Sequence, residues 1–280
     1  MIKKVAGQRL ATGPGERPER GIEASPSGRK LRALPQADRI AGLVQPDQSG
    51  LEVIRSGTCL RPVPLVPEIL LHQASDPISL WQRTEIAAGR TGLDPPFWAF
   101  AWAGGQALAR YLLDHREAVR GRRVIDIASG SGLVAIAAAR AGAAAVTAYD
   151  IDPLAVAALG VNAAANGAAV LAVRADVQGQ DGPPAPGADL VLVADAFYQR
   201  DLARNVMRFL ERACTPGTAV LVGDFGRAYL PRDRLTPLAT YDVPGQRVLE
   251  DSDVKRTTIW TRRRPARPVP VRAGWKQEWS

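Results

Sequence analysis

The chain has 280 residues, enough for one substantial core, and a formal net charge of +8 at pH 7. It contains no run of about 18 apolar residues of the kind that spans a membrane. Residues 1–50 carry +4 of the charge and residues 264–280 carry +3, whereas residues 51–263 carry only +1. Since the basic character lies at the two ends, we expect neither specific nucleic-acid binding nor membrane association.

Residues 1–50 are rich in Gly, Pro, Arg and Ser and show no sustained periodicity, which predicts a disordered basic extension. They lack the apolar central region of a secretion signal. The acidic residues Glu16, Glu19 and Glu23 argue against an organelle transit peptide.

Cysteine and histidine are too sparse for a metal site or a disulfide framework. Cys59 and Cys214 are isolated thiols, and His72 and His115 lie far from them along the chain. This spacing matches no zinc motif. We therefore expect no metal, a reducing cytoplasmic compartment and, by default, a monomer.

The region over residues 51–120 precedes the regular part of the chain. Its first part, through Trp81, predicts an N-terminal cap made of irregular and short helical pieces. Residues 95–105 then read Pro-Pro-Phe-Trp-Ala-Phe-Ala-Trp-Ala-Gly-Gly, which is dense in aromatic side chains. A helix is predicted over 106–114.

From residue 121 to residue 263 apolar runs of strand and helix length alternate. The strand candidates are 123–127, 145–149, 170–174, 189–194 and 218–223, and the helix candidates are 132–141, 153–166 and 201–213. This alternation predicts an α/β fold with a doubly wound, mostly parallel sheet. The strand-like runs 238–243 and 256–262 have no helix between them, so a terminal antiparallel hairpin completes seven strands. Residues 264–280 predict a loose basic tail.

The first strand of this series ends in a glycine turn, Asp126-x-Ala128-x-Gly130-x-Gly132, and the second strand delivers Asp150. Glycines at such a turn let the backbone approach a ligand closely. A carboxylate one strand over can accept hydrogen bonds from both hydroxyls of a ribose. The pattern therefore predicts a nucleoside site.

The type of nucleoside follows from two departures from a dinucleotide fingerprint. Position 135, where a third glycine would fall, is Ala135, and the acidic Asp126 would repel a pyrophosphate. An acid suits S-adenosylmethionine, whose amino-acid end carries an ammonium group. We therefore expect this cofactor and not a nicotinamide or flavin. Asp176, after the third strand, is a candidate partner for the adenine amine, or else a surface carboxylate.

One motif suggests a different substrate. Residues 94–97, Asp-Pro-Pro-Phe, match the motif with which adenine methyltransferases grip a flipped base. There the motif ends a sheet strand, whereas residues 86–93 make a poor strand. We therefore interpret 94–97 as a loop entering the aromatic segment.

The chain resembles the bacterial relatives of the electron transfer flavoprotein β-subunit lysine methyltransferases over about residues 51–263. The resemblance is carried by residues 95–111, 126–132, 195–198 (Asp-Ala-Phe-Tyr) and 223–231. It implies a seven-strand methyltransferase that methylates lysine, up to the trimethyl form, on the flavoprotein β-subunit or a ribosomal stalk protein. One departure is Ala128, where many members of the fold place glycine.

In such a site Asp195, at the end of the fourth strand, is our candidate to orient the incoming amine, with Tyr198 lining the lysine channel. The alternatives are a helix N-cap for Asp195 and core packing for Tyr198. Trp98 and Trp102 are candidates for walls of the cofactor site, because aromatic faces attract sulfonium cations; plain core packing competes. Asp152 is expected to cap a helix that begins at Pro153.

Two other functions remain open at this point. A small-molecule amine methyltransferase of nicotinamide type would use similar pocket chemistry. A catalytically silent cofactor-binding module would keep the glycine turn without turnover.

Overall fold

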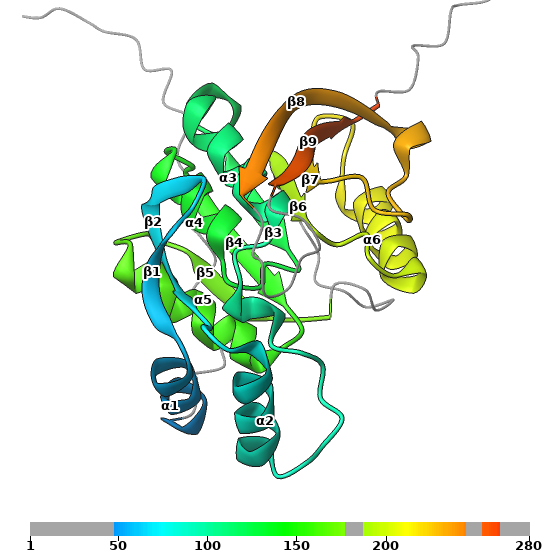
Figure 1. Cartoon of the computed structure of the whole chain (residues 1–280). Helices are drawn as coiled ribbons and strands as arrows, with labels where there is room; N and C mark the ends of the chain where they lie inside the picture. Colours follow the sequence, from blue (N-terminus) through cyan, green and yellow to red (C-terminus); the bar gives the residue numbers. More distant parts are fainter. Residues whose placement is uncertain (1–47, 177–186, 245–253, 264–280) are drawn as a thin grey trace, which may run out of the picture. The chain divides into compact units, whose positions relative to one another are not determined.

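A computed structural model describes residues 48–176, 187–244 and 254–263 (Figure 1). The predicted N-terminal extension and C-terminal tail fall outside these residues, apart from 48–50, which already belong to the first helix. None of the described helices is long and apolar enough to cross a membrane.

The core of the fold is a seven-stranded sheet with the strand order β5-β4-β3-β6-β7-β9-β8. Its strands are β3 (Arg123–Ile127), β4 (Ala145–Asp150), β5 (Leu171–Arg174), β6 (Leu190–Ala194), β7 (Ala219–Asp224), β8 (Leu235–Pro244) and β9 (Val254–Arg262). The first five are parallel, and β9 pairs antiparallel with both β7 and β8. The doubly wound sheet and its terminal antiparallel hairpin are thus confirmed.

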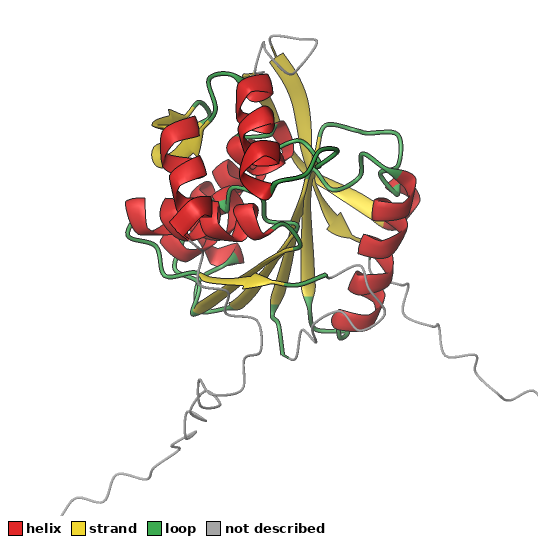
Figure 2. Cartoon of the chain, turned by 90° about the horizontal axis from the view of Figure 1, so that it is seen from below, coloured by secondary structure: helices red, strands yellow, loops and turns green. Residues whose placement is uncertain are grey.

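Helices cover both faces of the sheet (Figure 2). The helices α3 (Ala103–Asp114), α4 (Leu133–Arg140) and α5 (Pro153–Ala165) share one apolar core with the strands. On the opposite face α6 (Arg200–Ala213) packs its apolar side on β6 and β7. Because β6 is covered on both sides, its first four residues, Leu-Val-Leu-Val, are all buried.

The N-terminal cap contains α1 (Gln48–Gly57), a hairpin of β1 (Cys59–Val63) and β2 (Val66–Gln73), and α2 (Pro77–Ala88). The helices agree with the expected short helical pieces. The hairpin was not predicted, because prolines in and around the apolar run concealed the strands. The side-chain amides of Asn162 in α5 and of Asn166, the C-cap of that helix, form hydrogen bonds with the backbone of β2 at 2.6–2.9 Å. These amides satisfy an edge strand that has no sheet neighbour on that side. Single 3₁₀ turns span Phe97–Ala99, Arg116–Ala118 and Arg232–Arg234.

Helix α3 begins at Ala103, three residues before the predicted start, and its first turn contains Gly104 and Gly105. Glycine is unfavourable in helices, which explains the misplaced boundary. The structure shows why it is needed here: a Cβ on Gly104 would lie 2.3 Å from the carbonyl oxygen of Gly223 at the end of β7. The two glycines let α3 approach the carboxyl end of the sheet.

Gly104→Ala is therefore expected to destabilise the protein by about 1–3 kcal/mol, as overpacking of a tight core does. The measurement is the free energy of unfolding in urea. Gly160→Ala is the matched control, since it places the same methyl group on a helix where nothing lies within 4 Å. Equal stability of the two variants would contradict the close approach described here.

Candidate active site

A cavity of about 910 Å³ opens at the carboxyl ends of β3, β4 and β6. Its walls come from the glycine turn after β3, the ends of β4 and β6, the aromatic segment before α3, and the cap helices α1 and α2. Ligands of doubly wound sheets bind at this edge, where the strand order reverses. Here the reversal lies between β3 and β6.

The glycine turn is held by Asp150 from the neighbouring strand. One oxygen of this carboxylate accepts the N–H of Gly130 at 2.8 Å and the other accepts the N–H of Asp152 at 3.0 Å. Each oxygen keeps a further lone pair, and the side chain lines the cavity. The geometry leaves Asp150 able to accept from two ligand hydroxyls.

Three residues of the turn have left-handed backbone conformations: Ala128 (φ +53°), Gly130 (φ +51°) and Gly132 (φ +80°). A Cβ on Gly132 would lie 2.6 Å from Leu159 of α5, so this position requires glycine both for its φ and for its packing. Ala128 adopts the same conformation with a Cβ, at a cost of about 1–2 kcal/mol. Alanine in place of glycine at position 128 therefore adds backbone strain but leaves the conformation of the turn unchanged.

Asp126 is buried at the base of this turn. Burial raises the pKa of its carboxyl to about 8, the carboxylate of Asp150 adds to the rise, and the N–H of Ala135 opposes it. Its Oδ2 has no hydrogen-bond partner among the described residues. No oppositely charged group that the structure describes stabilises the ionised form of this buried carboxyl, which lines the cavity. A cationic ligand in the cavity would provide that charge.

Unpartnered polar atoms gather at this end of the cavity. Of the four buried side-chain polar atoms without a partner in the described part of the chain, three belong to residues that line it: Asp126 Oδ2, Ser129 Oγ and Trp98 Nε1. Buried polar groups are normally satisfied, so this cluster indicates a polar ligand. The donor set, with an acid at one end and Asp150 at the other, fits the ammonium group and the ribose of S-adenosylmethionine.

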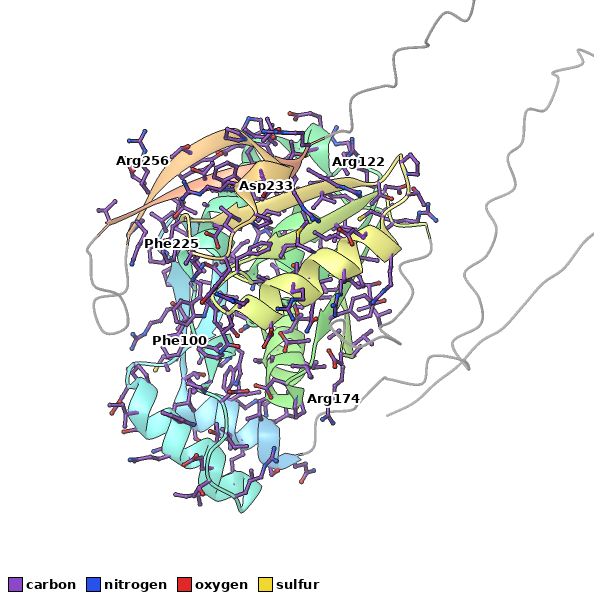
Figure 3. All side chains as sticks on the ribbon, turned by 90° about the vertical axis from the view of Figure 1, so that its right-hand side faces the viewer. Phe100, Arg122, Arg174, Phe225, Asp233 and Arg256 are labelled. Carbon is purple, nitrogen blue, oxygen red and sulfur yellow. The ribbon has the colours of Figure 1, made fainter. Side chains whose placement is uncertain are left out.

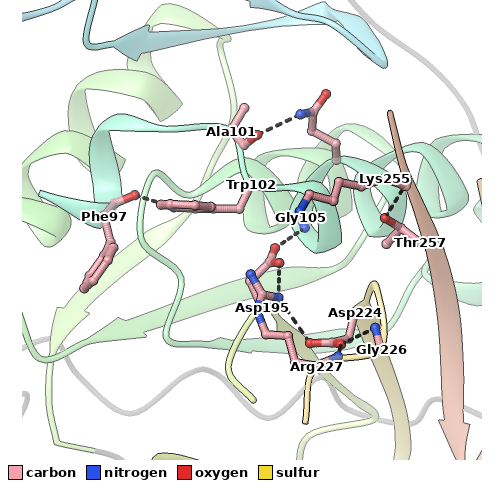
Figure 4. Close-up of polar contacts among 11 residues, drawn as sticks. Phe97, Ala101, Trp102, Gly105, Asp195, Asp224, Gly226, Arg227, Lys255 and Thr257 are labelled. Carbon is pink, nitrogen blue, oxygen red and sulfur yellow. Dashed lines mark hydrogen bonds and ion pairs between the residues drawn. The ribbon is translucent and has the colours of Figure 1, made fainter. Parts of the chain in front are cut away.

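The opening of the cavity is aromatic. Trp102 donates its ring N–H to the carbonyl of Phe97 at 2.8 Å (Figure 4). The Phe97 ring lies 5.8 Å from that of Tyr198. Tyr198 is 44% exposed, so the alternative that it packs in the core is wrong. Trp98, by contrast, is buried in a core cluster and also lines the cavity. Phe97 and Tyr198, which are both exposed, are placed to contact a side chain that enters from outside.

Asp195 is held by groups from two other elements (Figure 4). Its Oδ2 accepts the N–H of Gly105 in the first turn of α3 at 2.7 Å, and its Oδ1 accepts from the guanidinium of Arg227 at 2.5 Å. The alternative that Asp195 caps the helix following it was wrong, since the N-cap of α6 is Gln199. The N-cap residue of α3 is Trp102, whose side chain has no oxygen to accept a hydrogen bond from the first turn. Asp195 accepts that hydrogen bond instead and so caps α3 from a distant part of the chain.

Arg227 also binds a second carboxylate, Oδ2 of Asp224 at 3.2 Å, and its guanidinium lies 4.2 Å over the ring of Phe225. Burial raises the pKa of the Asp195 carboxyl, and the charge of Arg227 opposes that rise. Asp224 is itself fixed by the N–H groups of Gly226 and Arg227. Asp195, Arg227 and Asp224 thus form a cluster that joins the ends of β6 and β7, with the cation of Arg227 between the two acids.

The remaining predicted residues have plain outcomes. Asp152 caps α5, as expected, by accepting the N–H of Leu154. Residues 94–96 form a loop that leads into a 3₁₀ turn, as expected, and end no strand. Asp176 is exposed and does not line the cavity, so its role toward adenine stays a prediction. No cluster of possible metal ligands occurs among the described residues.

Three residues of the site were not identified from the sequence: Gly105, Asp224 and Arg227. The segment 223–231 was noticed only as part of a family pattern. The sequence did contain a signal for Asp224: it directly follows the strand candidate 218–223, just as Asp195 directly follows the preceding strand candidate, 189–194.

A doubly wound seven-stranded sheet with a terminal hairpin, a glycine turn over a buried acid and a second acid at the next strand end define an S-adenosylmethionine-dependent methyltransferase. The family described as ribosomal protein L11 methyltransferase (PrmA) matches residues 106–213. The electron transfer flavoprotein beta subunit lysine methyltransferase of Xenopus laevis is 34% identical over 82% of this chain and 95% of its own length. That of Mus musculus is 35% identical over 76% and 81%. The chain belongs to the family of electron transfer flavoprotein beta subunit lysine methyltransferases.

Proposed function

We propose that this enzyme methylates a lysine side chain of the electron transfer flavoprotein β-subunit. The observation that carries the proposal is the pair of features on one cavity: unpartnered polar atoms at its inner end, and Asp195 with exposed aromatic rings at its opening. The first fits a cofactor, and the second fits a long cationic side chain that enters from another protein. The names of the relatives at 34–35% identity supply the candidate substrate.

Asp126, Ala128, Gly130, Gly132, Asp150 and Trp102 are the proposed cofactor residues. When bound, S-adenosylmethionine supplies an electrophilic methyl group on its sulfonium sulfur, which leaves with the bonding electron pair. The backbone at Gly130 and Gly132 gives close access, and Asp150 accepts hydrogen bonds from the ribose. The carboxylate of Asp126 balances the ammonium group.

Asp150→Ala is expected to weaken the binding of S-adenosylhomocysteine about 10- to 100-fold, because hydrogen bonds to a charged acceptor contribute about 1.5–3 kcal/mol. Titration calorimetry measures the dissociation constant. Asp94→Ala is the control, since it removes another acid that lines the cavity, whereas the N–H of Gly130 in the glycine turn is bound by Asp150. An unchanged dissociation constant for the Asp150 variant would refute the ribose assignment.

The methyl acceptor must be a neutral amine. A free lysine has a pKa of about 10.4, so only about one molecule in a thousand is neutral near pH 7.4. Burial in the cavity lowers the pKa of the amine, and no strong general base is then needed. Asp195 accepts a hydrogen bond from the amine and orients its lone pair, while Tyr198 and Phe97 contact the aliphatic part of the side chain.

Arg227 has a defined part in this scheme. A carboxylate with its full charge would hold the target lysine in its protonated form, which cannot accept a methyl group. The guanidinium of Arg227 on Oδ1 of Asp195 offsets that charge and leaves the hydrogen-bonding capacity of the acid. Asp195 can therefore orient the amine without trapping its proton.

The test is incubation of the purified enzyme with radiolabelled S-adenosylmethionine and one methyl acceptor at a time. The acceptors are purified flavoprotein, purified ribosomal protein L11 and a lysate. Label on a lysine of the flavoprotein β-subunit, located by mass spectrometry, is the expected result. Label on L11 instead would favour the second candidate, the stalk protein, which the name of the matching family model suggests. Label confined to small molecules would identify a metabolite enzyme. No label despite cofactor binding would identify a silent module.

We also propose that the enzyme works as a monomer in the cytoplasm. The two free thiols of Cys59 and Cys214 support a reducing compartment.

A further inference from the structure

Helix α6 carries an arginine at every fourth position, Arg200, Arg204, Arg208 and Arg212, and all four are exposed. We name these four residues the arginine stripe. Positions four apart lie on one side of a helix, and the stripe spans about 18 Å at 1.5 Å per residue. The helix lies on the side of the molecule that faces the viewer in Figure 3.

Helix stability does not explain this pattern. Like charges four residues apart destabilise a helix by about 0.2–0.5 kcal/mol per pair, and a cation in the first turn opposes the helix dipole. The helix has two acids. Asp201 pairs with Arg204 at 3.3 Å, but Glu211 is bound by Arg234 from outside the helix at 2.7 Å. Arg208 makes no ion pair with any described residue.

The arginine stripe begins at the opening of the active-site cavity. Its first member follows Tyr198 by two positions, and Leu202, in the first turn of α6, lines the cavity. The guanidinium of Arg200 lies 5.9 Å over the ring of Tyr229. A protein with a lysine in the cavity would therefore present the surface around that lysine to this helix.

We propose that the arginine stripe binds an acidic surface segment of the protein substrate and aligns its target lysine with the cavity. This proposal rests on the proposed protein methylation. Guanidinium groups bind carboxylates in a bidentate manner, so arginine suits this partner better than lysine would. Nucleic acid is the weaker candidate, because the arginine stripe is a local positive surface on a region, residues 51–263, whose net charge is only +1.

The test compares the double variant Arg204→Glu/Arg208→Glu with the wild type on intact substrate protein. We expect the KM to rise at least tenfold, the kcat to change less than twofold, and the KM of the wild type to depend on salt more steeply than that of the variant. Activity on a short neutral peptide around the target lysine is expected to be equal for both. The matched control is Arg116→Glu/Arg120→Glu, also four residues apart, at the amino end of β3.

An unchanged KM for the stripe variant, with the wild type active on the same protein, would overturn the proposal. The same holds if the control variant shows the same rise in KM, since general charge would then be the cause. Loss of binding to a labelled 20-nucleotide RNA without change in KM would assign the surface to nucleic acid instead. Failure of the proposed function is distinct: there the wild type itself would label no protein.

Discussion

Asp195→Ala is expected to lower methyl transfer about 100-fold while cofactor binding stays within a few-fold of the wild type. The change removes the oxygen that orients the amine, and small errors in alignment cost about that much in a displacement reaction. It also releases the N–H of Gly105 and leaves Arg227 with one acid fewer, so the amino end of α3 loses its cap. Single-turnover rates with saturating protein substrate measure the effect.

The design must separate orientation from folding, because Asp195 has a left-handed backbone (φ +56°) that alanine tolerates poorly. Asp195→Asn is the control. Asparagine accepts this conformation and keeps an oxygen for Gly105, but it has no charge for Arg227. We expect it to melt near the wild-type temperature and still to transfer methyl groups slowly. Near wild-type turnover in a folded Asp195→Ala variant would show that the acid does not orient the amine.

The parts of the site that follow one strand could be predicted from the sequence. The glycine turn, Asp150 and the strand end at Asp195 each lie within a few residues of an apolar run that is long enough to identify. Helix α5 was placed within one residue because Asp152 and Pro153 mark its start unambiguously. These features are local, and local rules of capping, turn formation and periodicity determine them.

The parts that were missed depend on contacts between distant residues. Arg227 reaches Asp195 only because β6 and β7 are neighbours in the sheet, which places residues 32 positions apart within hydrogen-bond distance. The start of α3 at Ala103 depends on Gly223, with which Gly104 is in contact across the fold. Neither the pairing of strands nor the approach of a helix is encoded in a short window. The same holds for β2, whose edge is satisfied by amides of α5 almost 100 residues later.

Arg227→Gln is expected to shift the rising limb of the pH profile of kcat, which reports the enzyme–substrate complex, upward by at least about one pH unit. Removal of a cation within a few ångströms raises the pKa of every titratable group that faces it, by about 1–3 units for a close pair. Those groups are Asp195, Tyr198 and the target amine. Because the reaction needs the neutral amine, activity rises with pH, and a higher pKa moves that rise to higher pH.

Arg227→Lys separates charge from geometry, since it keeps the cation and loses the planar fork that spans two acids. We expect its pH profile to stay near that of the wild type even if its kcat falls. The glutamine variant also leaves two acids close together with no cation between them, a loss that costs about 3–5 kcal/mol for a buried pair. Its melting temperature should therefore rise as the pH falls and one of the acids gains a proton. A pH profile that is identical in the wild type, glutamine and lysine variants would show that Arg227 only holds β7 against β6. A shift in the glutamine variant alone would instead show that its charge sets the protonation of the methyl acceptor.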